Sequence, residues 1–422
     1  MTISSSLNAG VAGLAANSSR LAAISDNIAN ASTAGYKRVV TSFESMVISQ
    51  SGGSYAAGGV SVSNTRMIDQ RSSLISTSSA TDLAVDGRGF IPVASLSEVK
   101  AGEDPTMLLT TSGSFKTNEE GYLTTSSGLV LLGWEANADE TFPTVARDTD
   151  DPLVPIKFDT AQLSAAPTTY VSLGVNLPAE SAVTGAAGDT EENTIQYFDN
   201  LGGQQDLDIT YTPTGLADNE WTMEITDGAT GTVVGLYTLT FDDSQTGKGT
   251  LSSVVTTTGG AYDATSGSII VSADSGPIEI EIGVMTQLSS AFSAATIEKD
   301  GYEAASFSGV KVDEGGYVHA LYENGSSRIV YQIPLADMPN PNGMTSLDSQ
   351  TFMPSSASGA FYLWDAGTGP TGNVASNSLE ESTTDVATEL TAMIQTQRAY
   401  SSNAKVIQTV DEMLQETTNI KR

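Results

Sequence analysis

The chain has 422 residues, 39% of them hydrophobic, which is enough to bury the cores of two or three domains. It contains no cysteine, which excludes a disulfide framework, a thiolate metal site and a catalytic thiol. Its net charge of -32 argues against nucleic acid as a partner, because phosphates would repel it.

The negative charge is concentrated in the middle of the chain. Residues 1–100 and 380–422 carry net charges of +1 and -3, whereas residues 101–379 carry seven basic and 37 acidic residues. No apolar run approaches the ~18 residues of a membrane span, so we expect no membrane insertion. The first residues lack an early basic group and an unbroken apolar core, so we expect no cleaved secretory signal.

The chain starts with a pattern that predicts an amphipathic helix. Two glycines, Gly10 and Gly13, each cost such a helix about 1 kcal/mol relative to alanine, so the helix needs a partner. Large apolar residues recur at seven-residue or neighbouring positions and form one stripe. They are Leu7, Val11, Leu14, Leu21, Ile24 and Ile28.

Residues 39–80 are rich in serine and glycine and show weak periodicity, which indicates a connecting segment with short extended pieces. Beyond it, Asp86-Gly87 predicts a turn in a strand-rich stretch. Two stretches, FKTNEEGYLTT from Phe115 and VKVDEGGYVHA from Val310, align without gaps as strand, turn and strand. We therefore expect a discontinuous β domain made of residues 81–160 and 285–365.

The stretch between these two segments also predicts β structure. It contains the alternating runs TTYVSLGVNL, LDITYT, WTMEIT, GLYTLTF and SIIVSA, separated by Gly, Asp, Asn and Pro. The expected organisation is an N-terminal helix and motif (1–38), a connecting segment (39–80), the discontinuous β domain, an inserted outer β domain (165–284), a linker (366–382) and a C-terminal helix (383–422).

The C-terminal pattern predicts a helix of about 35 residues, because no Gly or Pro interrupts residues 383–422. A seven-residue apolar repeat of this length is typical of a coiled coil. The repeat consists of Val386, Met393, Tyr400, Ile407 and Leu414, with Leu390, Gln397, Ala404 and Asp411 four residues after its first four members. The fold class is thus mainly β with α-helical termini that form a coiled-coil-like core.

Two interpretations of the terminal helices remain open. They could pack only on each other within one globular domain. Alternatively, they could pack against other copies of the chain, an assembly role that their low net charge favours, because acidic surfaces stack at a high electrostatic cost.

No constellation of residues indicates catalysis, a cofactor or a metal. The only histidine, His319, lies in an expected hairpin strand, where a structural role is the commoner one. The acidic clusters RDTDDP (147–152) and FDDS (241–244) lack the spacing of a calcium loop and suit a solvated face. We therefore expect that the chain is not an enzyme.

The first helix runs directly into NIANASTAGYKR, residues 27–38. Its Asn, Gly, Ser and Thr residues suit a helix end followed by a turn. Taken whole, the stretch resembles the N-terminal motif of the bacterial flagellar axial proteins, the rod and hook family. The motif positions are Asn27, Asn30, Thr33, Gly35, Tyr36 and Lys37.

The C-terminal helix is similar to the closing helix of the same family. The matching residues are Gln397, Arg398, Tyr400, Asn403, Lys405 and Met413. Several middle segments, among them YFDNLGGQQDL and YENGSSRIVYQIPLADMPNPNGM, resemble the hook members of the family. Residues 379–385 depart from the family pattern, which has Asn-Val before the Asp.

The resemblance implies a structural subunit of the flagellar hook, a flexible curved tube that acts as a universal joint and transmits torque from rod to filament. It implies a helical homopolymer whose terminal helices form the inner tube, with rod, hook-cap and hook–filament junction proteins as partners. It also implies passage through the type III export apparatus without a cleaved signal peptide, to an extracellular hook.

Two alternatives remain. The distal rod protein of the basal body shares the terminal motifs but is expected to be shorter and to lack an inserted domain. A surface-layer or adhesin-type protein would account for the acidic Ser/Thr-rich body but not for the paired terminal motifs.

Overall fold

A computed structural model describes residues 3–46, 58–102, 105–137, 140–159 and 164–420. The remaining residues, including part of the 39–80 segment, lie outside the description. The chain divides into two compact units. The first comprises Met1–Asp159, Gly309–Leu321 and Ser327–Arg422, and the second comprises Thr160–Ser308 and Tyr322–Ser326.

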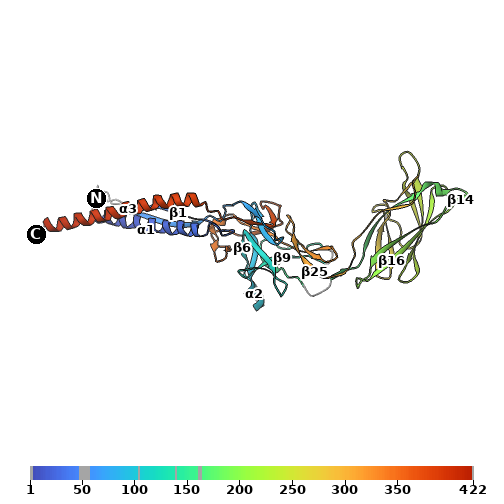
Figure 1. The fold of residues 1–422 in the computed structure, drawn as a ribbon, viewed down its shortest axis with the longest axis horizontal. Helices are drawn as coiled ribbons and strands as arrows, with labels where there is room; N and C mark the ends of the chain where they lie inside the picture. The colour runs from blue at the N-terminus through green and yellow to red at the C-terminus, as the bar shows by residue number, and fades with distance from the viewer. Residues whose placement is uncertain (1–2, 47–57, 103–104, 138–139, 160–163, 421–422) are drawn as a thin grey trace. The chain divides into compact units, whose positions relative to one another are not determined.

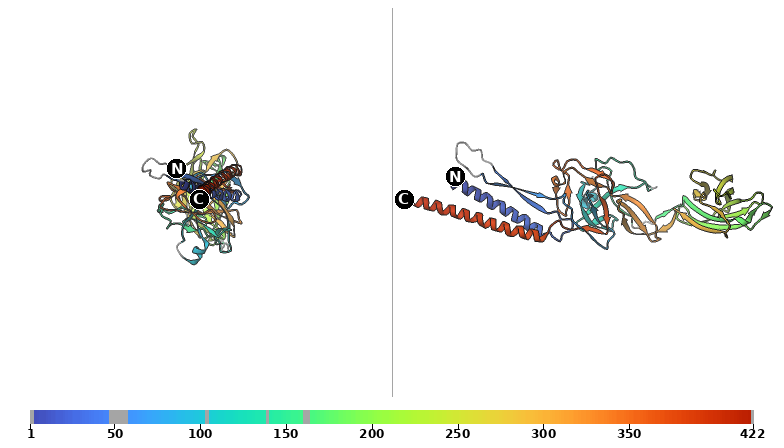
Figure 2. Two further views of the ribbon diagram at one scale, coloured as in Figure 1. Left: turned by 90° about the vertical axis from the view of Figure 1, so that its left-hand side faces the viewer. Right: turned by 90° about the horizontal axis from the view of Figure 1, so that it is seen from above.

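Two long helices, α1 (Ile3–Ala29) and α3 (Val386–Ile420), lie side by side and antiparallel in the first unit (Figures 1 and 2). The α3 helix begins after Asp385, whose Oδ1 accepts a 2.6 Å hydrogen bond from the backbone N–H of Thr388. Such an N-cap satisfies one of the donors that every helix start leaves unpaired. The helical termini predicted from the heptad patterns are therefore confirmed.

Beside α1 lies an antiparallel ribbon of strands β1 (Val39–Ser45) and β2 (Val60–Arg66), where the sequence indicated only short extended pieces. The strands are rich in β-branched valine and threonine, which favour extended backbone. The Arg20 guanidinium of α1 lies 5.6 Å from the centre of the Phe43 ring and attaches the ribbon to the helix.

The β part of the first unit is built around one 13-stranded sheet with the main order β29-β30-β6-β5-β9-β8-β7-β4-β32, from which β10, β25, β26 and β27 branch. Its core contains Phe90, Leu109, Trp134, Phe352 and Leu363. A short helix, α2 (Leu96–Ala101), follows β5. The strands are β4 (Asp82–Asp86), β5 (Ile91–Ser95), β6 (Leu108–Thr110), β7 (Ser112–Thr117), β8 (Leu123–Thr125), β9 (Leu129–Glu135), β10 (Val154–Pro155), β25 (Phe307–Val312), β26 (Tyr317–Tyr322), β27 (Ser327–Gln332), β29 (Thr345–Ser346), β30 (Phe352–Met353) and β32 (Asn373–Ser376).

The two similar sequence stretches form similar hairpins, β7-β8 and β25-β26. In each hairpin, the side-chain oxygen of the first turn residue, Asn118 or Asp313, accepts a 2.9 Å hydrogen bond from the backbone N–H four residues later. A glycine with positive φ, Gly121 or Gly316, precedes that donor residue. The shared turn chemistry explains why the two stretches resemble each other.

The 366–382 segment, expected to be a linker, contributes two strands. Strand β32 pairs with β4, and β33 (Ser378–Glu380) pairs with β3 (Leu74–Ser76). These pairings fix the backbone that leads into α3.

The second unit contains a ten-stranded sheet of order β15-β16-β17-β18-β19-β22-β12-β21-β20, with β23 pairing β12. The five alternating runs of the sequence all fall on strands of this sheet. Residues 285–308, expected in the discontinuous domain, also belong to this unit. Its core is built around Trp221, Tyr197, Tyr211 and Tyr237. The strands are β12 (Tyr170–Pro178), β15 (Glu191–Phe198), β16 (Gln204–Pro213), β17 (Glu220–Asp227), β18 (Thr232–Asp242), β19 (Thr250–Thr258), β20 (Ser268–Ala273), β21 (Gly276–Glu281), β22 (Thr286–Leu288) and β23 (Ser293–Lys299).

The fold is thus mainly β with helical termini, as the sequence predicted. In the part of the chain that the structure describes, neither long helix has the length and apolar character needed to cross a membrane.

Candidate functional site

The N-terminal motif forms the joint at which α1, α3 and the β part of the first unit meet. Asn27 lies in the last turn of α1, and Lys37 lies two residues before β1. Between them the chain turns, and the backbone N–H of Gly35 donates a 2.8 Å hydrogen bond to the carbonyl of Glu380 in β33. The motif therefore faces the segment that enters α3.

Asn27 is buried and uses both ends of its amide. Its Nδ2 donates to the backbone oxygen of Val39 at 2.9 Å and to Oε1 of Glu389 in α3 at 3.2 Å. Its Oδ1 accepts a 2.8 Å hydrogen bond from the backbone N–H of Val39. A single asparagine thus links the end of α1, the start of β1 and the first turn of α3, and no shorter or purely accepting side chain could do the same.

Tyr36 contacts Asn27 through its hydroxyl group. Its hydroxyl lies 2.9 Å from Oδ2 of Asp26 and 3.1 Å from Oδ1 of Asn27, and the Arg66 guanidinium lies 5.1 Å from its ring centre. Burial and, next, the hydrogen bond to Asp26 raise the pKa of Tyr36 to about 12. The phenol therefore stays neutral and keeps its donor over the whole physiological range.

Lys37 is completely buried and pairs with a buried carboxylate. Its Nζ lies 2.6 Å from Oε1 of Glu380 and donates a 2.8 Å hydrogen bond to the backbone oxygen of Gln70. The same Glu380 oxygen accepts a 2.9 Å hydrogen bond from the N–H of Ser72. Burial lowers the pKa of Lys37 to about 8, and the charge of Glu380 opposes that shift.

Arg38 and Thr383 complete the joint. The backbone N–H of Arg38 donates to Oγ1 of Thr383 at 2.8 Å, and the N–H of Thr383 donates to the carbonyl of Tyr36 at 3.0 Å. The Arg38 guanidinium lies 3.7 Å from the carboxylate of Glu389. Backbone and side chains from both ends of the chain therefore interlock over a few residues.

The other N-terminal motif residues act locally. The amide of Asn30 donates to the backbone oxygen of Asp26 at 2.9 Å, and the hydroxyl of Thr33 lies 3.3 Å from Oδ1 of Asn30. These contacts shape the helix end and make no link to α3.

Three residues that the C-terminal part of the chain contributes to the joint were not among the sequence candidates: Glu380, Thr383 and Glu389. Glu380 lies in the segment that departs from the family pattern. The sequence indicates only that a buried motif lysine needs an acidic partner, and it does not show which acidic residue that partner is.

Along the helix pair, α3 comes close to α1 at two glycines. A Cβ on Gly10 would lie 3.1 Å from Cγ1 of Ile407, and one on Gly13 would lie 2.7 Å from Nδ2 of Asn403. The glycines that weaken the isolated helix thus allow the close approach of its partner. Of the C-terminal motif residues, Asn403 lies in this interface, next to Gly13.

The apolar candidates divide by exposure. Ile24 is buried, and Leu7, Leu14, Leu21, Ile28, Met393 and Ile407 are half-buried. Ala16 and Ala23 of α1 and Thr396 and Val410 of α3 are also buried, although none was a sequence candidate. The exposed candidates and motif residues are Val11, Val386, Leu390, Gln397, Arg398, Tyr400, Lys405, Met413 and Leu414, of which Lys405 donates a 3.1 Å hydrogen bond to Oε1 of Gln408.

No group of three or more His, Asp or Glu side chains suited to a metal ion occurs among the described residues. His319 lies on β26, half-buried, with Nε2 3.3 Å from Oδ2 of Asp313 in the hairpin turn. Of the acidic clusters, the first pairs Arg147 with Asp365 at 2.8 Å, and in the second Asp242 accepts a 2.8 Å hydrogen bond from the N–H of Ser244. Both clusters have structural contacts.

Three family models match the chain. They are described as Flagella basal body rod protein (residues 7–37), Flagellar basal body protein FlaE D2 domain (residues 175–302) and Flagellar basal body rod FlgEFG protein C-terminal (residues 375–420). The first and last include the two sides of the joint, and the middle one lies within the second unit.

Relatives match over the full length. Flagellar hook protein FlgE of Rhizobium meliloti is 35% identical over 425 residues and that of Brucella suis 34% over 424, with 100% of both chains covered. FlgE of Salmonella typhimurium is 27% identical, covering 99% of this chain and all of that one. A crystal structure of Helicobacter pylori flagellar hook protein FlgE2 aligns with a TM-score of 0.47 and 13% identity, over 71% of this chain and 98% of that chain. Given relatives one-third identical across both entire chains, this chain belongs to the flagellar hook protein family.

Proposed function

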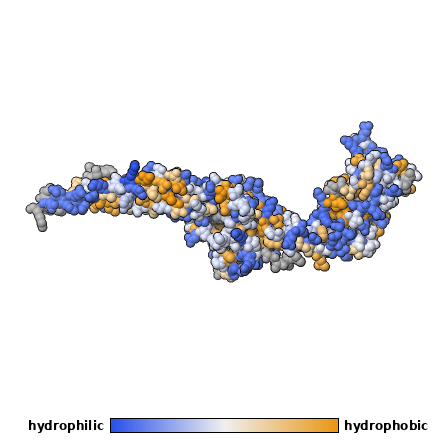
Figure 3. All heavy atoms as spheres, viewed as in Figure 1, coloured by the Kyte–Doolittle hydropathy of each residue, from blue (hydrophilic) through white to orange (hydrophobic). Residues whose placement is uncertain are grey.

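We propose that α1 and α3 form the axial core of the hook polymer and that exposed apolar residues of α3 pack against other copies of the chain. The supporting observation is a ridge of Val386, Leu390 and Ile394, four residues apart and 42%, 47% and 53% exposed. Residues at this spacing share one face of a helix. Figure 3 shows hydrophobic residues gathered on the helical part near the β body.

This ridge differs from the face of α3 that packs on α1. The packed face contains the buried Glu389, Thr396 and Val410. A helix that is apolar on a second side has more apolar surface than one partner helix covers, and burying it in an assembly is favourable by roughly 25 cal/mol per Å².

As a member of the flagellar hook proteins, the chain is a structural subunit of the bacterial flagellum, located in the hook, and is not an enzyme. The distal rod protein and the surface-layer alternatives are not favoured, because the full-length relatives are hook proteins.

We further propose that the polymer is a flexible curved tube that transmits torque, that rod, hook-cap and hook–filament junction proteins are its neighbours, and that subunits pass through the type III export apparatus without a cleaved signal. The acidic second unit suits the outer, water-facing layer of such a tube. The absence of cysteine suits a chain that is exported unfolded. In this arrangement the second unit is an inserted outer domain.

The experiment replaces Leu390 and Ile394 together by Asn in the full-length protein. The double variant should retain the thermal unfolding of the wild-type monomer, because both side chains are exposed, yet form no hooks by electron microscopy. Ser401→Asn, at an exposed position of the same helix, should assemble normally. Curved hooks of normal length from the double variant would contradict the proposal.

A further inference from the structure

The chain contains two Asn-Gly dipeptides, Asn324-Gly325 and Asn342-Gly343. An asparagine followed by glycine deamidates most readily, because no β-carbon shields the backbone nitrogen that attacks the side-chain amide. The first dipeptide lies in the turn between β26 and β27, and the second ends the 3₁₀ helix η2 (Pro341–Gly343). The surroundings of each glycine therefore determine which asparagine reacts.

The backbone at Gly325 has room for the ring closure that deamidation requires. Asn324 and Gly325 are both exposed, and a Cβ built on Gly325 would meet no atom within 4 Å. A Cβ on Gly343 would instead lie 2.5 Å from the backbone carbonyl of Ala357. Closing a ring at Asn342 would therefore require the packed neighbouring main chain to move, and a close-packed interior resists such a shift.

Two donors from one residue hold the amide oxygen of Asn324. Its Oδ1 accepts a 3.0 Å hydrogen bond from the backbone N–H of Ser326 and a 2.6 Å hydrogen bond from the hydroxyl of the same residue. When the nitrogen of Gly325 adds to Cγ, negative charge develops on Oδ1, and donors already in place stabilise this oxyanion. Among the described residues, Oδ1 of Asn342 has a single donor, the backbone N–H of Asp69 at 3.1 Å.

The attacking nitrogen and the leaving amide both make hydrogen bonds in the folded turn. The N–H of Gly325 donates to the carbonyl of Tyr322 at 3.0 Å, and Nδ2 of Asn324 donates to the carbonyl of Glu303 at 3.2 Å. Hydrogen bonds in an exposed turn open locally at a small cost in free energy. Hydroxide can then remove the proton of Gly325, so the reaction should accelerate as the pH rises.

We propose that Asn324 is a site of spontaneous deamidation. The deprotonated nitrogen of Gly325 bonds to Cγ of Asn324, and the bond from Cγ to Nδ2 breaks. The Nδ2 group takes a proton from water and leaves as ammonia, which produces a succinimide. Water then opens this ring at either carbonyl and yields aspartate or isoaspartate. Both products carry a negative charge that the amide lacks, and isoaspartate also lengthens the main chain of the turn by a methylene group.

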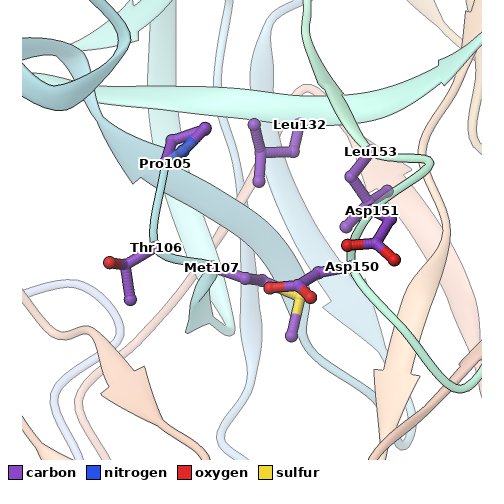
Figure 4. Close-up of a pocket in the computed structure, with 7 residues that line it drawn as sticks. All are labelled: Pro105, Thr106, Met107, Leu132, Asp150, Asp151 and Leu153. Carbon is purple, nitrogen blue, oxygen red and sulfur yellow. The ribbon is translucent and has the colours of Figure 1, made fainter. Parts of the chain in front are cut away.

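Aspartate can form the same succinimide, but the acidic pocket of the first unit lacks the residue that must follow it. Asp150 and Asp151 border this pocket, whose volume is about 260 Å³ (Figure 4). Asp150 is followed by Asp151, which has a β-carbon, and Asp151 is followed by Pro152, which has no N–H to lose. The two carboxyl groups of this pocket are therefore not a second site.

The test incubates the purified full-length protein at neutral and at mildly alkaline pH. Mass spectrometry of proteolytic peptides then follows the deamidated fraction at Asn324 and at Asn342, which is the matched control within the same chain. Isomerisation of aspartate leaves the mass unchanged and is not counted. Asn324 should react about tenfold faster than Asn342 or more, which corresponds to a barrier lower by about 1.4 kcal/mol. Its rate should also rise with pH.

Two further measurements separate the effect of the fold from that of the dipeptide. S326A removes one oxyanion donor and should slow the reaction at Asn324 by about tenfold or more. In urea, where the fold is lost, Asn324 and Asn342 should react at similar rates, and S326A should have no effect. Equal rates at the two asparagines of the folded protein, a wild-type rate in folded S326A, or a difference between the asparagines that persists in urea would each overturn the proposal.

Discussion

The ammonium group of Lys37 lies 2.6 Å from the carboxylate of Glu380, although 343 residues separate them in the chain. The two side chains are 0% and 1% exposed. A buried pair of this kind does little for stability compared with an apolar pair, yet the loss of one partner is costly. The pair therefore makes the entry into α3 depend on the N-terminal motif.

We expect K37M to destabilise the joint by about 3–5 kcal/mol, because it leaves Glu380 buried without a counter-charge. The double variant K37M/E380Q should recover most of this loss, since the amide is neutral and its oxygen can still accept from Ser72. Urea unfolding combined with amide exchange at Gly35 and Arg38 measures the effect. The exposed pair Lys100–Glu120, 2.8 Å apart, provides the control: K100M should cost less than about 1 kcal/mol. Equal losses in K37M and K100M would show that burial of the pair has no consequence.

Asn27→Ala should cost roughly 2–4 kcal/mol, because it removes partners from both polar backbone groups of Val39 and from Glu389. Asn30→Ala removes only contacts within its own helix end and should cost about 1 kcal/mol or less. The same unfolding measurement compares the two, and hook assembly should fail only for the Asn27 variant. A larger effect at Asn30 would contradict the central role given to Asn27.

Tyr36 should make the joint sensitive to alkali. Its folded pKa of about 12 exceeds the ordinary value of 10.0, so the folded state holds this proton more tightly than the unfolded state does. The resulting stabilisation is fully present below pH 10 and is lost as the pH rises through 12; two pKa units correspond to roughly 3 kcal/mol. Y36F should show a shallower fall in unfolding free energy between pH 10 and 12, followed by circular dichroism in urea. Y362F, at an exposed tyrosine, should retain the wild-type slope.

Two glycines in neighbouring turns allow a matched test of packing in the β part of the first unit. Gly121 and Gly128 have φ of +89° and +81°, so alanine at either position costs about 1 kcal/mol in backbone strain. A Cβ on Gly121 would also overlap the backbone oxygen of Phe158, whereas one on Gly128 has nothing within 4 Å. We expect G121A to lose at least 2 kcal/mol more than G128A by urea unfolding. Similar values for both would mean that the turn at Gly121 moves freely.

The features that depend on local pattern could be predicted from the amino-acid sequence. Heptad spacing without Gly or Pro was sufficient to predict α3, because residues three or four apart share one face of a helix whatever that face packs against. Alternation gave the strands of the second unit for the same reason, and the Asn118 and Asp313 turns are closed by hydrogen bonds within five residues. The family motifs at both ends also lie in the sequence itself.

Which surfaces meet could not be predicted, because it depends on contacts between segments far apart in the chain. Periodicity placed Val386 and Leu390 on the apolar side of α3, but it did not show that Thr396 and Val410 are the residues buried within the unit while Val386 and Leu390 stay exposed. The chain bends after Asp86, at Gly87, where φ is +115°, yet β4 and β5 pair with other strands rather than with each other. The partners of Asn27 and Lys37 come from 362 and 343 residues away, and no local signal distinguishes Glu389 and Glu380 from the other carboxylates of an acidic chain. Contacts closed across such a distance carry no local signal, because the entropy of closing a long loop is paid before they contribute energy and many alternative partners are available.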